Sequence, residues 1–380
     1  MAPTEVGDQV TENAEQGRRY KLISSDSHVN EPPNLWTDRV PEAFRDRAPK
    51  MEHFEEGDAW VIEGVKDPIN FGMNACAGLA PEAMKGWARF DEIRHGGWDP
   101  ASRIAEMDED GVDAEVLYPS PRLSGAIVAN RDVDYHNVMI RAYNDWISEY
   151  VEYAPDRFGG LALLPNRGAE GAVAELERVI DRPGIRGVQI GCWPNGTLQL
   201  QPEDDKLFAL LAERHIPLSI HVALGQSMPG AHRAKLPGYG RFFDAPNRMI
   251  EMVFEGVFDR FPELNVFFAE VDFGWVPYVK EQIDNNYLRL DAVSKFGLEQ
   301  LPSEYIARHF HFGYMTDTFG LRNLEYMGAE RVLWSSDYPH ISADWPSSWR
   351  VIQSSMSGVS LADRQLILAG NAQRLYKFGL

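Results

Sequence analysis

The chain has only two cysteines, Cys76 and Cys192, among its 380 residues. Two cysteines cannot build the disulfide framework of a small secreted protein, and such scarcity is typical of a reducing compartment. The first residues contain no apolar run with a basic flank, so we expect no signal peptide. These absences predict a cytoplasmic protein.

Long apolar runs and an excess of basic residues are also missing. No segment approaches the roughly 18 consecutive apolar residues of a membrane-spanning helix. The 37 lysine and arginine residues are outnumbered by 57 aspartate and glutamate residues, which gives a net charge of −20. Contact with nucleic-acid phosphates requires clustered positive charge. We therefore expect neither a nucleic acid nor a membrane as partner, and predict a small-molecule substrate.

Apolar residues, in contrast, are plentiful. They make up 44% of the sequence, which is ample for a large core. A chain of this length fits two or three domains, but α/β barrels of this size often form one. Residues 1–20 are polar and acidic, and we predict that they are disordered. Residues 21–380 are predicted to form one domain.

Short apolar runs alternate with helical patterns along this domain. Strands that alternate with helices indicate a parallel sheet, and eight such units in about 360 residues favour a closed barrel over an open sheet. We therefore predict a (β/α)₈ TIM barrel. Its strands are centred on Ile23, Val116, Leu163, Val188, Ile220, Phe267, Phe310 and Leu333. Its helices are expected at 99–110, 134–152, 169–181, 202–215, 249–261, 275–290, 318–327 and 361–376.

Polar side chains stand where several of these strands end. Asp26 and His28 end strand one, His221 ends strand five, Glu270 ends strand six and Asp337 follows strand eight. Functional groups of a barrel lie at the C-terminal ends of its strands. Carboxylates combined with imidazoles suit Zn²⁺, Mn²⁺ or Fe²⁺. We predict that these five residues hold one or two divalent metal ions.

Eight stretches carry a resemblance to a known family through their order and spacing. They are DSH at 26–28, MDEDGVD at 107–113, LLP at 163–165, GIRGVQ at 184–189, IH at 220–221, FDRFP at 258–262, WSSDYPH at 334–340 and GNA at 370–372. The chain resembles the amidohydrolase superfamily, within it the amidohydrolase-related (amidohydrolase 2) branch. That branch includes metal-dependent aromatic-acid and aminocarboxymuconate-semialdehyde decarboxylases. The resemblance implies a (β/α)₈ barrel with one or two divalent metals, and relatives are commonly dimers or larger, so we expect a homo-oligomer.

The resemblance also implies roles for single residues. The family's first-strand motif is His-x-His or Glu-x-His, and Asp26 keeps a carboxylate at the first ligand position. His221 matches the strand-five ligand, and Asp337 matches an aspartate that binds metal and commonly handles a proton. Many relatives carry a histidine on strand six, where this chain has Glu270. Glu270 is therefore a candidate ligand, metal bridge or general base, the alternative being a salt bridge to an arginine such as Arg186.

Four further residues are candidates for supporting roles. His340 follows Asp337 closely and is expected to support it by hydrogen bonding, with a hydrogen bond to a neighbouring loop as the alternative. Tyr118 and Trp193 end strands two and four and are expected to line the pocket, with plain packing as the alternative. His232 follows strand five in the sequence and is expected to reach the substrate, with a plain surface or loop position as the alternative.

A long insertion follows strand one, from about residue 37 to residue 98. It is rich in aromatic residues and methionine but lacks a clear period. An insertion of this length is usually functional or carries small elements of its own. Because it leaves the barrel at the catalytic face, we predict a lid or pocket wall for a bulky, mainly apolar substrate. A satellite core is the alternative.

The predicted site supports more than one function. Our leading prediction is hydrolysis of a carboxylic-acid derivative, an ester, thioester or amide, by metal-activated water, with Asp337 or Glu270 accepting the proton. The alternative is non-oxidative decarboxylation of an aromatic or unsaturated acid, with an acid protonating the carbon that loses CO₂. Family precedent favours decarboxylation, whereas the missing strand-six histidine favours hydrolysis. A third alternative is a barrel that only binds a ligand.

Overall fold

The computed structural model describes residues 21–224 and 240–380. The predicted disordered segment 1–20 and the candidate His232 therefore lie outside the described residues. In the described part of the chain, no helix is both long enough and apolar enough to cross a membrane.

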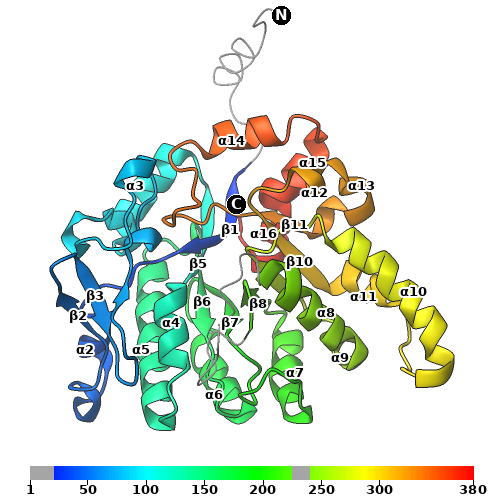
Figure 1. The fold of residues 1–380 in the computed structure, drawn as a ribbon, viewed down its shortest axis with the longest axis horizontal. Helices are drawn as coiled ribbons and strands as arrows, with labels where there is room; N and C mark the ends of the chain where they lie inside the picture. The colour runs from blue at the N-terminus through cyan, green and yellow to red at the C-terminus, as the bar shows by residue number, and fades with distance from the viewer. Residues whose placement is uncertain (1–20, 225–239) are drawn as a thin grey trace, which may run out of the picture.

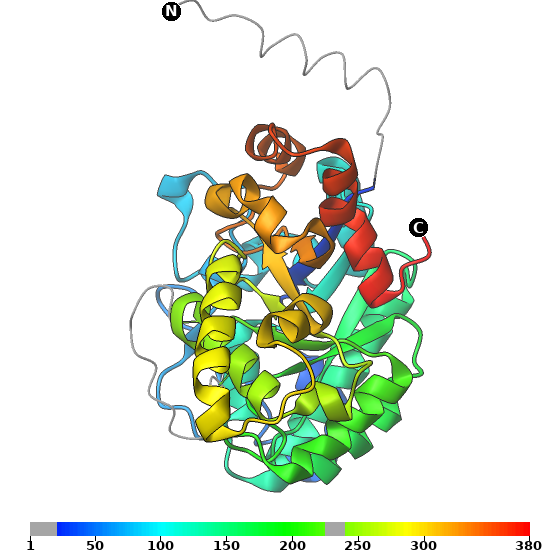
Figure 2. The same ribbon diagram turned by 90° about the vertical axis from the view of Figure 1, so that its right-hand side faces the viewer.

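Eight parallel strands form the centre of the molecule, and each of the eight predicted strand centres lies in or beside one of them. The strands pair in sequence order, so each lies next to the strand that precedes it and the strand that follows it. Helices surround them on the outside (Figures 1 and 2). The predicted (β/α)₈ barrel is thereby confirmed. The strands are β1 (Ile23–His28), β5 (Ala114–Tyr118), β6 (Phe158–Leu163), β7 (Ile185–Ile190), β8 (Leu218–His221), β9 (Val266–Ala269), β10 (Phe310–Tyr314) and β11 (Val332–Trp334).

The first and last strands approach each other and all but close the barrel. The Asp337 N–H donates to the Asp26 carbonyl at 2.9 Å, and the His28 N–H donates to the Tyr338 carbonyl at 2.6 Å. The Ser25 hydroxyl donates to the carbonyl of Trp334 at 2.9 Å. Two segments more than 300 residues apart in the chain therefore present their polar ends side by side.

Burial explains why the strands read as nearly continuous apolar runs. Every residue of β5, β6, β8, β9, β10 and β11 is buried. Strands of a parallel barrel have helices on one side and the barrel core on the other, so neither side faces water. The few polar residues on such strands must therefore find partners inside the protein.

The helices lie between the strands, as predicted. The helix that follows the insertion has the expected residues at its ends. Asp99 is the N-cap and accepts a hydrogen bond from the Ser102 N–H, and Pro100 is the first helical residue. Gly111 ends the helix with a left-handed φ of 78°. The helices outside the insertion are α3 (Pro100–Asp110), α4 (Pro121–Val128), α5 (Val133–Glu152), α6 (Ala169–Val179), α7 (Asp205–Arg214), α8 (Ala245–Phe254), α9 (Val257–Arg260), α10 (Val276–Ser294), α11 (Pro302–His309), α12 (Thr318–Arg322), α13 (Leu324–Met327), α14 (Ser348–Ser355), α15 (Leu361–Gln365) and α16 (Asn371–Tyr376).

Several helices differ from the sequence-based expectation. Helices α4, α11 and α14 were not predicted, and the expected helices at 249–261 and 318–327 are each replaced by two helices. The expected helix at 361–376 is interrupted by a π-helical turn, η9 (Leu366–Gly370), whose residues 367–369 are buried. Short helices and local changes of winding depend on packing against neighbours more than on sequence period.

The insertion after β1 carries small elements of its own. It contains α2 (Leu35–Arg39) and an antiparallel sheet of β2 (Lys50–His53), β3 (Asp58–Val61) and β4 (Ile69–Asn70). In Figure 1 these elements lie on one side of the barrel, beside α5, while α10 projects on the opposite side. Five single 3₁₀ turns complete the insertion: η1 (Glu42–Phe44), η2 (Gly72–Asn74), η3 (Pro81–Ala83), η4 (Phe90–Glu92) and η5 (His95–Gly97).

Candidate metal centre

The predicted ligands come together at the C-terminal ends of the strands. Asp26 and His28 lie at the end of β1, and His221 is the last residue of β8. Glu270 directly follows β9, and Asp337 lies three residues beyond β11. Glu270 and Asp337 have left-handed backbone, with φ of 58° and 52°. Such backbone is uncommon outside glycine and concentrates at functional sites.

The distances between these side chains are those of one compact cluster. His28 Nε2 lies 3.4 Å from Asp26 Oδ1 and 3.4 Å from Asp337 Oδ1. His221 Nε2 lies 3.1 Å from His28 Nε2 and 4.0 Å from Glu270 Oε2. In Asp26, His28, His221 and Glu270, one ligand atom from each lies within 4.8 Å of all the others. This cluster is able to hold a metal ion.

Hydrogen bonding sets the tautomer of His28. Its Nδ1 lies 3.0 Å from the carbonyl of Pro119, which can only accept, so Nδ1 carries the proton. Its Nε2 lone pair then faces the cluster. Burial lowers the pKa of His28 well below its usual value, and lowers that of His221 to about 4. Both rings are thus neutral near pH 7, the form in which imidazole binds a metal.

Three carboxyl groups share the cluster: Asp26 and Asp337 are buried, and Glu270 is half-buried. Burial raises the pKa of Asp26 well above its usual value, and the charge of Asp337 raises it further. Burial likewise raises the pKa of Glu270, again assisted by Asp337 and Asp26. Asp337 differs, because His340 and Ser342 outweigh its burial and lower its pKa.

The residues fit a divalent cation. Both carboxylate oxygens of Asp26 are buried and accept no hydrogen bond from the described residues. Two neutral imidazoles also face each other through Nε2 atoms only 3.1 Å apart. A buried carboxylate without donors is costly, and a bound cation removes that cost.

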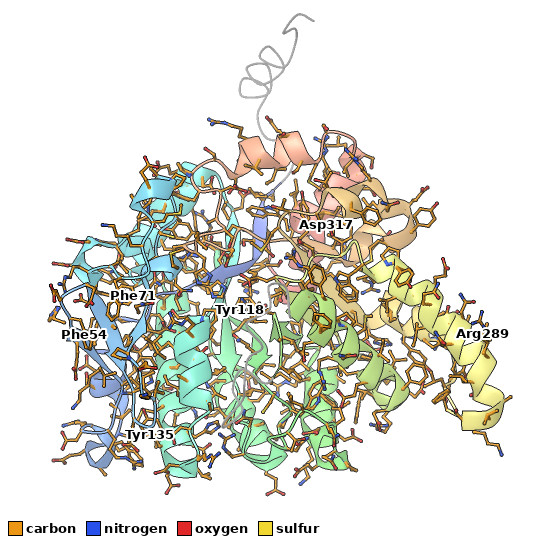
Figure 3. The ribbon with its side chains drawn as sticks, viewed as in Figure 1. Phe54, Phe71, Tyr118, Tyr135, Arg289 and Asp317 are labelled. Carbon is orange, nitrogen blue, oxygen red and sulfur yellow. The ribbon has the colours of Figure 1, made fainter. Side chains whose placement is uncertain are left out.

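The candidate supporting residues lie at different distances from the cluster. His340 stacks on His28 with ring centroids 3.9 Å apart, and its Nδ1 lies 2.8 Å from Asp337 Oδ1. Tyr118 is fully buried among the barrel strands (Figure 3), with its ring 5.7 Å from that of His28. Trp193 is also fully buried, and its ring packs against that of Phe208 in α7. For Trp193 the structure therefore supports the packing alternative.

The alternative partner for Glu270 lies elsewhere. Arg186 donates to the main-chain carbonyls of Pro155, Tyr376 and Lys377. The arginine near Glu270 is instead Arg241, in the π-helical turn η7 (Gly240–Asp244). Its Nη2 lies 3.0 Å from Asp272 Oδ2 and donates to the main-chain carbonyl of Glu270 at 3.4 Å.

Sequence reasoning missed a buried ion pair beside the cluster. Arg103 of α3 has no exposed surface, and its Nε donates to Glu115 Oε2 in β5 at 2.6 Å. The same guanidinium donates to the carbonyl of His28 at 2.9 Å and lies over the ring of Tyr338, 4.4 Å from its centroid. A glutamate in the middle of an otherwise apolar strand was the one signal for this pair.

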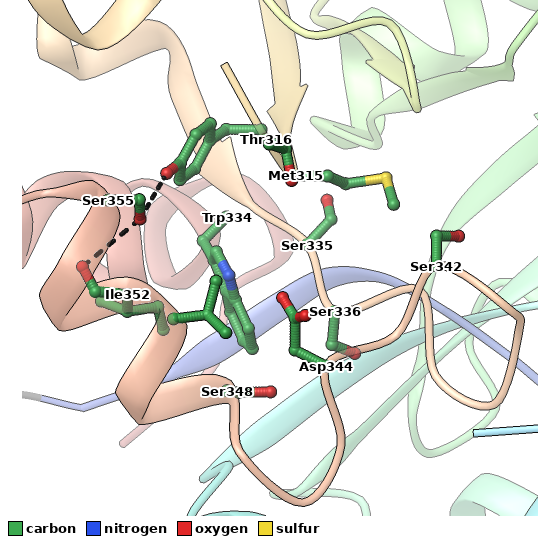
Figure 4. A pocket seen from close by; sticks show the side chains of 12 residues that line it. Met315, Thr316, Trp334, Ser335, Ser336, Ser342, Asp344, Ser348, Ile352 and Ser355 are labelled. Carbon is green, nitrogen blue, oxygen red and sulfur yellow. Dashed lines mark hydrogen bonds between the residues drawn. The ribbon is translucent and has the colours of Figure 1, made fainter. Parts of the chain in front are cut away.

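A small polar cavity lies next to the cluster, between the ends of β10 and β11 and α14 (Figure 4). It has about 10 Å³ of room, enough for about one water molecule and too little for an organic substrate. Ser342 lines this cavity, and its hydroxyl group donates a hydrogen bond to Asp337 Oδ2. The cavity therefore borders one predicted ligand without being a substrate pocket.

The protein has a parallel eight-stranded barrel, and carboxylates and imidazoles gather at the ends of its strands. These two features place it in the class of α/β-barrel proteins with a candidate metal centre at the C-terminal face. Comparison with known proteins narrows this class. The family model described as Amidohydrolase matches residues 26–378, so the chain belongs to the amidohydrolase family.

Individual relatives are decarboxylases. A gamma-resorcylate decarboxylase of Polaromonas sp. (strain JS666 / ATCC BAA-500) is 27% identical over 294 residues, covering 72% of this chain and 86% of the relative. A 2-amino-3-carboxymuconate-6-semialdehyde decarboxylase of Dictyostelium discoideum is 30% identical over 259 residues, covering 66% of this chain and 69% of the relative. The solved 5-carboxyvanillate decarboxylase of Novosphingobium aromaticivorans, with bound manganese, superimposes with a TM-score of 0.68 at 18% identity, covering 96% and 99% of the two chains.

These comparisons overturn the leading prediction of a hydrolase. The relatives described above are named as decarboxylases, and none of them is named as a hydrolase of an ester, thioester or amide. The prediction failed because of how Glu270 was interpreted. Since it replaces the strand-six histidine, it was taken as a bridge between two metal ions, and a water molecule held by both ions was expected to attack the substrate carbonyl. A metal cluster of this kind serves either reaction, and the ligands alone do not distinguish them.

Proposed function

We propose that the protein is a metal-dependent, non-oxidative decarboxylase of an aromatic or unsaturated carboxylic acid. The observation that carries the proposal is the cluster of Asp26, His28, His221, Glu270 and Asp337 in a chain that is similar to gamma-resorcylate and aminocarboxymuconate-semialdehyde decarboxylases. The overall reaction breaks the bond from carbon to the carboxylate, releases CO₂ and places a proton on that carbon.

The proposed ion is held by Asp26, His28, His221 and Asp337. Such an ion polarises the oxygen atoms that bind it. Manganese in a solved relative makes Mn²⁺ the first ion to test, with Zn²⁺ and Fe²⁺ next. Neutral imidazoles and the ionised Asp337 are the ligand forms that this role requires.

Glu270 is the proposed proton donor. Burial raises its pKa well above the usual value, so it keeps a proton at a pH where an exposed glutamate is ionised. Asp337, whose pKa is lowered, is better suited to bind the ion than to supply a proton. The opposite pKa shifts of these two neighbouring carboxyl groups support different roles for them, with Glu270 supplying the proton and Asp337 binding the ion.

The remaining sequence-based expectations enter the proposal unchanged. The insertion at about 37–98 is proposed as a wall of the substrate pocket, Tyr118 as a pocket residue, and residues 21–380 as one domain. A small molecule remains the proposed substrate, the cytoplasm the proposed location and a homo-oligomer the proposed assembly. Light scattering on the purified protein tests the last point.

The test of function is release of CO₂ from a panel of hydroxybenzoates and unsaturated acids by Mn²⁺-loaded protein. We expect turnover in the panel, and in D₂O one deuterium on the carbon that loses CO₂. Thioesters and esters serve as the comparison set. Hydrolysis of these without any CO₂ release from the acids would refute the proposal.

The role of Glu270 is tested in the same assay. We expect Glu270→Gln to lower kcat by about 100-fold or more while the protein keeps its metal, because the amide has the same shape and cannot donate the required proton. Glu263→Gln, which alters an exposed glutamate just before β9, is the matched control. Loss of metal together with activity would instead make Glu270 a ligand.

A further inference from the structure

The turn that directly follows β9 carries the proposed proton donor on an uncommon backbone. Glu270 and Asp272 both have a left-handed φ, of 58° and 51°. Left-handed backbone costs free energy in residues other than glycine, and it persists only where the surrounding structure holds it. The groups that hold this turn therefore determine where the carboxyl group of Glu270 lies.

Asp272 joins the turn to two neighbouring elements. Its side chain is buried, and its Oδ1 accepts from the N–H of Met315, the residue after β10, at 3.2 Å. Its Oδ2 lies 3.0 Å from Nη2 of Arg241 in η7. The same Nη2 donates to the main-chain carbonyl of Glu270 at 3.4 Å. Asp272 thus holds the turn on β10, and its partner Arg241 reaches Glu270 itself.

Other contacts hold the residues that follow Glu270 in the turn. The indole N–H of Trp275 donates to the carbonyl of Val271 at 3.1 Å. Asp317 Oδ2 accepts from the N–H groups of Phe273 and Gly274 at 2.9 and 2.6 Å. These contacts fix the far side of the turn, whereas the contact from Arg241 falls on the residue that carries the proposed proton donor.

The direction of the Glu270 side chain depends on this backbone. Its Oε2 lies 4.0 Å from Nε2 of His221, and 22% of the side chain is exposed. A partly exposed side chain is not fixed by close packing, so a rotation of the turn would move the carboxyl group away from the cluster. A misplacement of about 1 Å is enough to lower a rate by about 100-fold.

We propose that Asp272 is a positioning residue that, through its ion pair with Arg241, keeps the carboxyl group of Glu270 directed at the cluster. The inference rests on the proposed function, in which Glu270 supplies the proton. It adds to that function two residues that act through Glu270.

The first test measures Asp272→Asn in the CO₂-release assay. Asparagine has the shape of aspartate but no charge, so the ion pair with Arg241 is lost. We expect kcat to fall by about 10- to 100-fold, while KM and the Mn²⁺ content stay unchanged. An unchanged kcat in Asp272→Asn would overturn the proposal.

Asp113→Asn is the matched control. Like Asp272, Asp113 pairs with a basic side chain, that of Lys21 at 3.3 Å, and accepts from a main-chain N–H, that of Leu22 at 2.8 Å. It directly precedes β5 and therefore lies at the opposite end of the barrel from the cluster. We expect its kcat to equal that of the wild type. A fall as large as that in Asp272→Asn would contradict a specific role for Asp272.

The second test is the double variant Asp272→Asn with Glu270→Gln. A residue that acts only through the carboxyl group of Glu270 has nothing left to position once that group is replaced. We therefore expect the double variant to have the kcat of Glu270→Gln alone. A merely structural role for Asp272 would lower kcat again by the factor seen in the single variant, and that result would refute the proposal.

A third test changes the other member of the ion pair, at a partly exposed position. Arg241→Lys keeps the positive charge, so we expect it to retain most of the wild-type kcat. Arg241→Met removes the charge, and we expect a fall like that in Asp272→Asn. Equal kcat values in these two variants would show that the ion pair does not position Glu270.

Crystal structures of the wild type and of Asp272→Asn allow the two proposals to fail separately. We expect the carboxyl group of Glu270 to face the cluster in the wild type and to turn away, or to occupy two conformations, in Asp272→Asn. If no acid in the panel loses CO₂, the proposed function fails, and the structures still decide whether Asp272 positions Glu270. An unmoved Glu270 in Asp272→Asn would overturn the positioning role and leave decarboxylation in place.

Discussion

At the scale of single residues, Asp26 combines full burial with two carboxylate oxygens that accept no hydrogen bond from the described residues. Its neighbours are His28, which shares its strand end, and Asp337, whose charge raises the pKa of Asp26. Such a residue weakens the fold unless something positive binds to it. The same side chain that costs stability in the metal-free protein is therefore expected to contribute metal affinity.

We predict opposite effects of Asp26→Asn on binding and on stability. The affinity for Mn²⁺, measured by titration calorimetry, should fall by more than about 10-fold. The free energy of unfolding in EDTA, measured with urea, should rise by about 1–3 kcal/mol because the variant lacks a carboxyl group that burial disfavours in its ionised form. Asp91→Asn, at an exposed position, should change neither. A metal-free Asp26→Asn protein that is less stable than wild type would disprove the burial argument.

His136 is a second residue with a measurable signature, away from the metal centre. It is buried on α5, its Nε2 accepts from the Asn166 N–H at 3.2 Å, and burial lowers its pKa to about 3. Because its folded-state pKa lies below the unfolded value near 6.5, the unfolded chain takes up the proton first. Its contribution to stability is therefore complete above about pH 6.5 and is lost as the pH falls towards about 3.

We predict that this loss appears as a difference in slope. Between pH 6 and pH 4, the free energy of unfolding of the wild type should fall more steeply than that of His136→Gln, by about 1.4 kcal/mol per pH unit. Other buried groups titrate equally in both proteins and cancel. Urea unfolding at several pH values measures both slopes, and parallel slopes would show that His136 is protonated in the folded state.

At the scale of elements, α3 is held on the barrel by a buried ion pair as well as by apolar packing. Arg103 connects this helix to Glu115 in β5 and to the carbonyl of His28 at the end of β1. It also lies within 3.3 Å of the carbonyl of Gly96 in η5. One buried guanidinium thus connects a helix, two strands and the insertion beside the cluster.

We predict that Arg103→Met destabilises the protein by about 3–5 kcal/mol, because it leaves the carboxylate of Glu115 buried without its partner. The double variant Arg103→Met with Glu115→Leu should recover part of this loss, since it removes the unpaired charge. Denaturant unfolding of the two variants provides the comparison. A double variant less stable than the single one would mean that Glu115 is stabilised by other groups, such as Ser27.

At the scale of the whole molecule, the proposed ion links parts of the chain that are far apart. The proposed ligands come from β1, β8 and the segment after β11, so the site exists only when the barrel is formed. An ion that binds the folded cluster and not the unfolded chain stabilises the entire fold.

We predict that Mn²⁺ raises the free energy of unfolding by about 2.7 kcal/mol when its free concentration is 100 times the Kd. Calorimetric scans at increasing Mn²⁺ should show a Tm that rises with the logarithm of concentration, and EDTA should reverse the rise. Asp337→Asn should reduce the response strongly. A Tm that does not depend on Mn²⁺ in the wild type would contradict the proposed centre.

The sequence by itself determined the barrel and most of the cluster. Strand positions follow from short apolar runs, and a barrel requires polar side chains at strand ends to converge on one face. Asp26, His28 and His221 could therefore be placed beside Glu270 and Asp337 without a structure. The choice between hydrolysis and decarboxylation could not be made this way, because both reactions use the same kinds of ligand.

Only the tertiary structure decided the contacts around that cluster. Arg103 looks like an ordinary helix residue in the sequence, and its pairing with Glu115 appears only when α3 packs on β5. Asn74 lies in an insertion without periodicity, 266 positions from His340, and nothing local indicates that the two meet. The ends of strands follow from the local sequence pattern. Contacts such as Arg103 with Glu115 and Asn74 with His340 depend instead on how distant segments of the chain are brought together, and the local sequence does not show this.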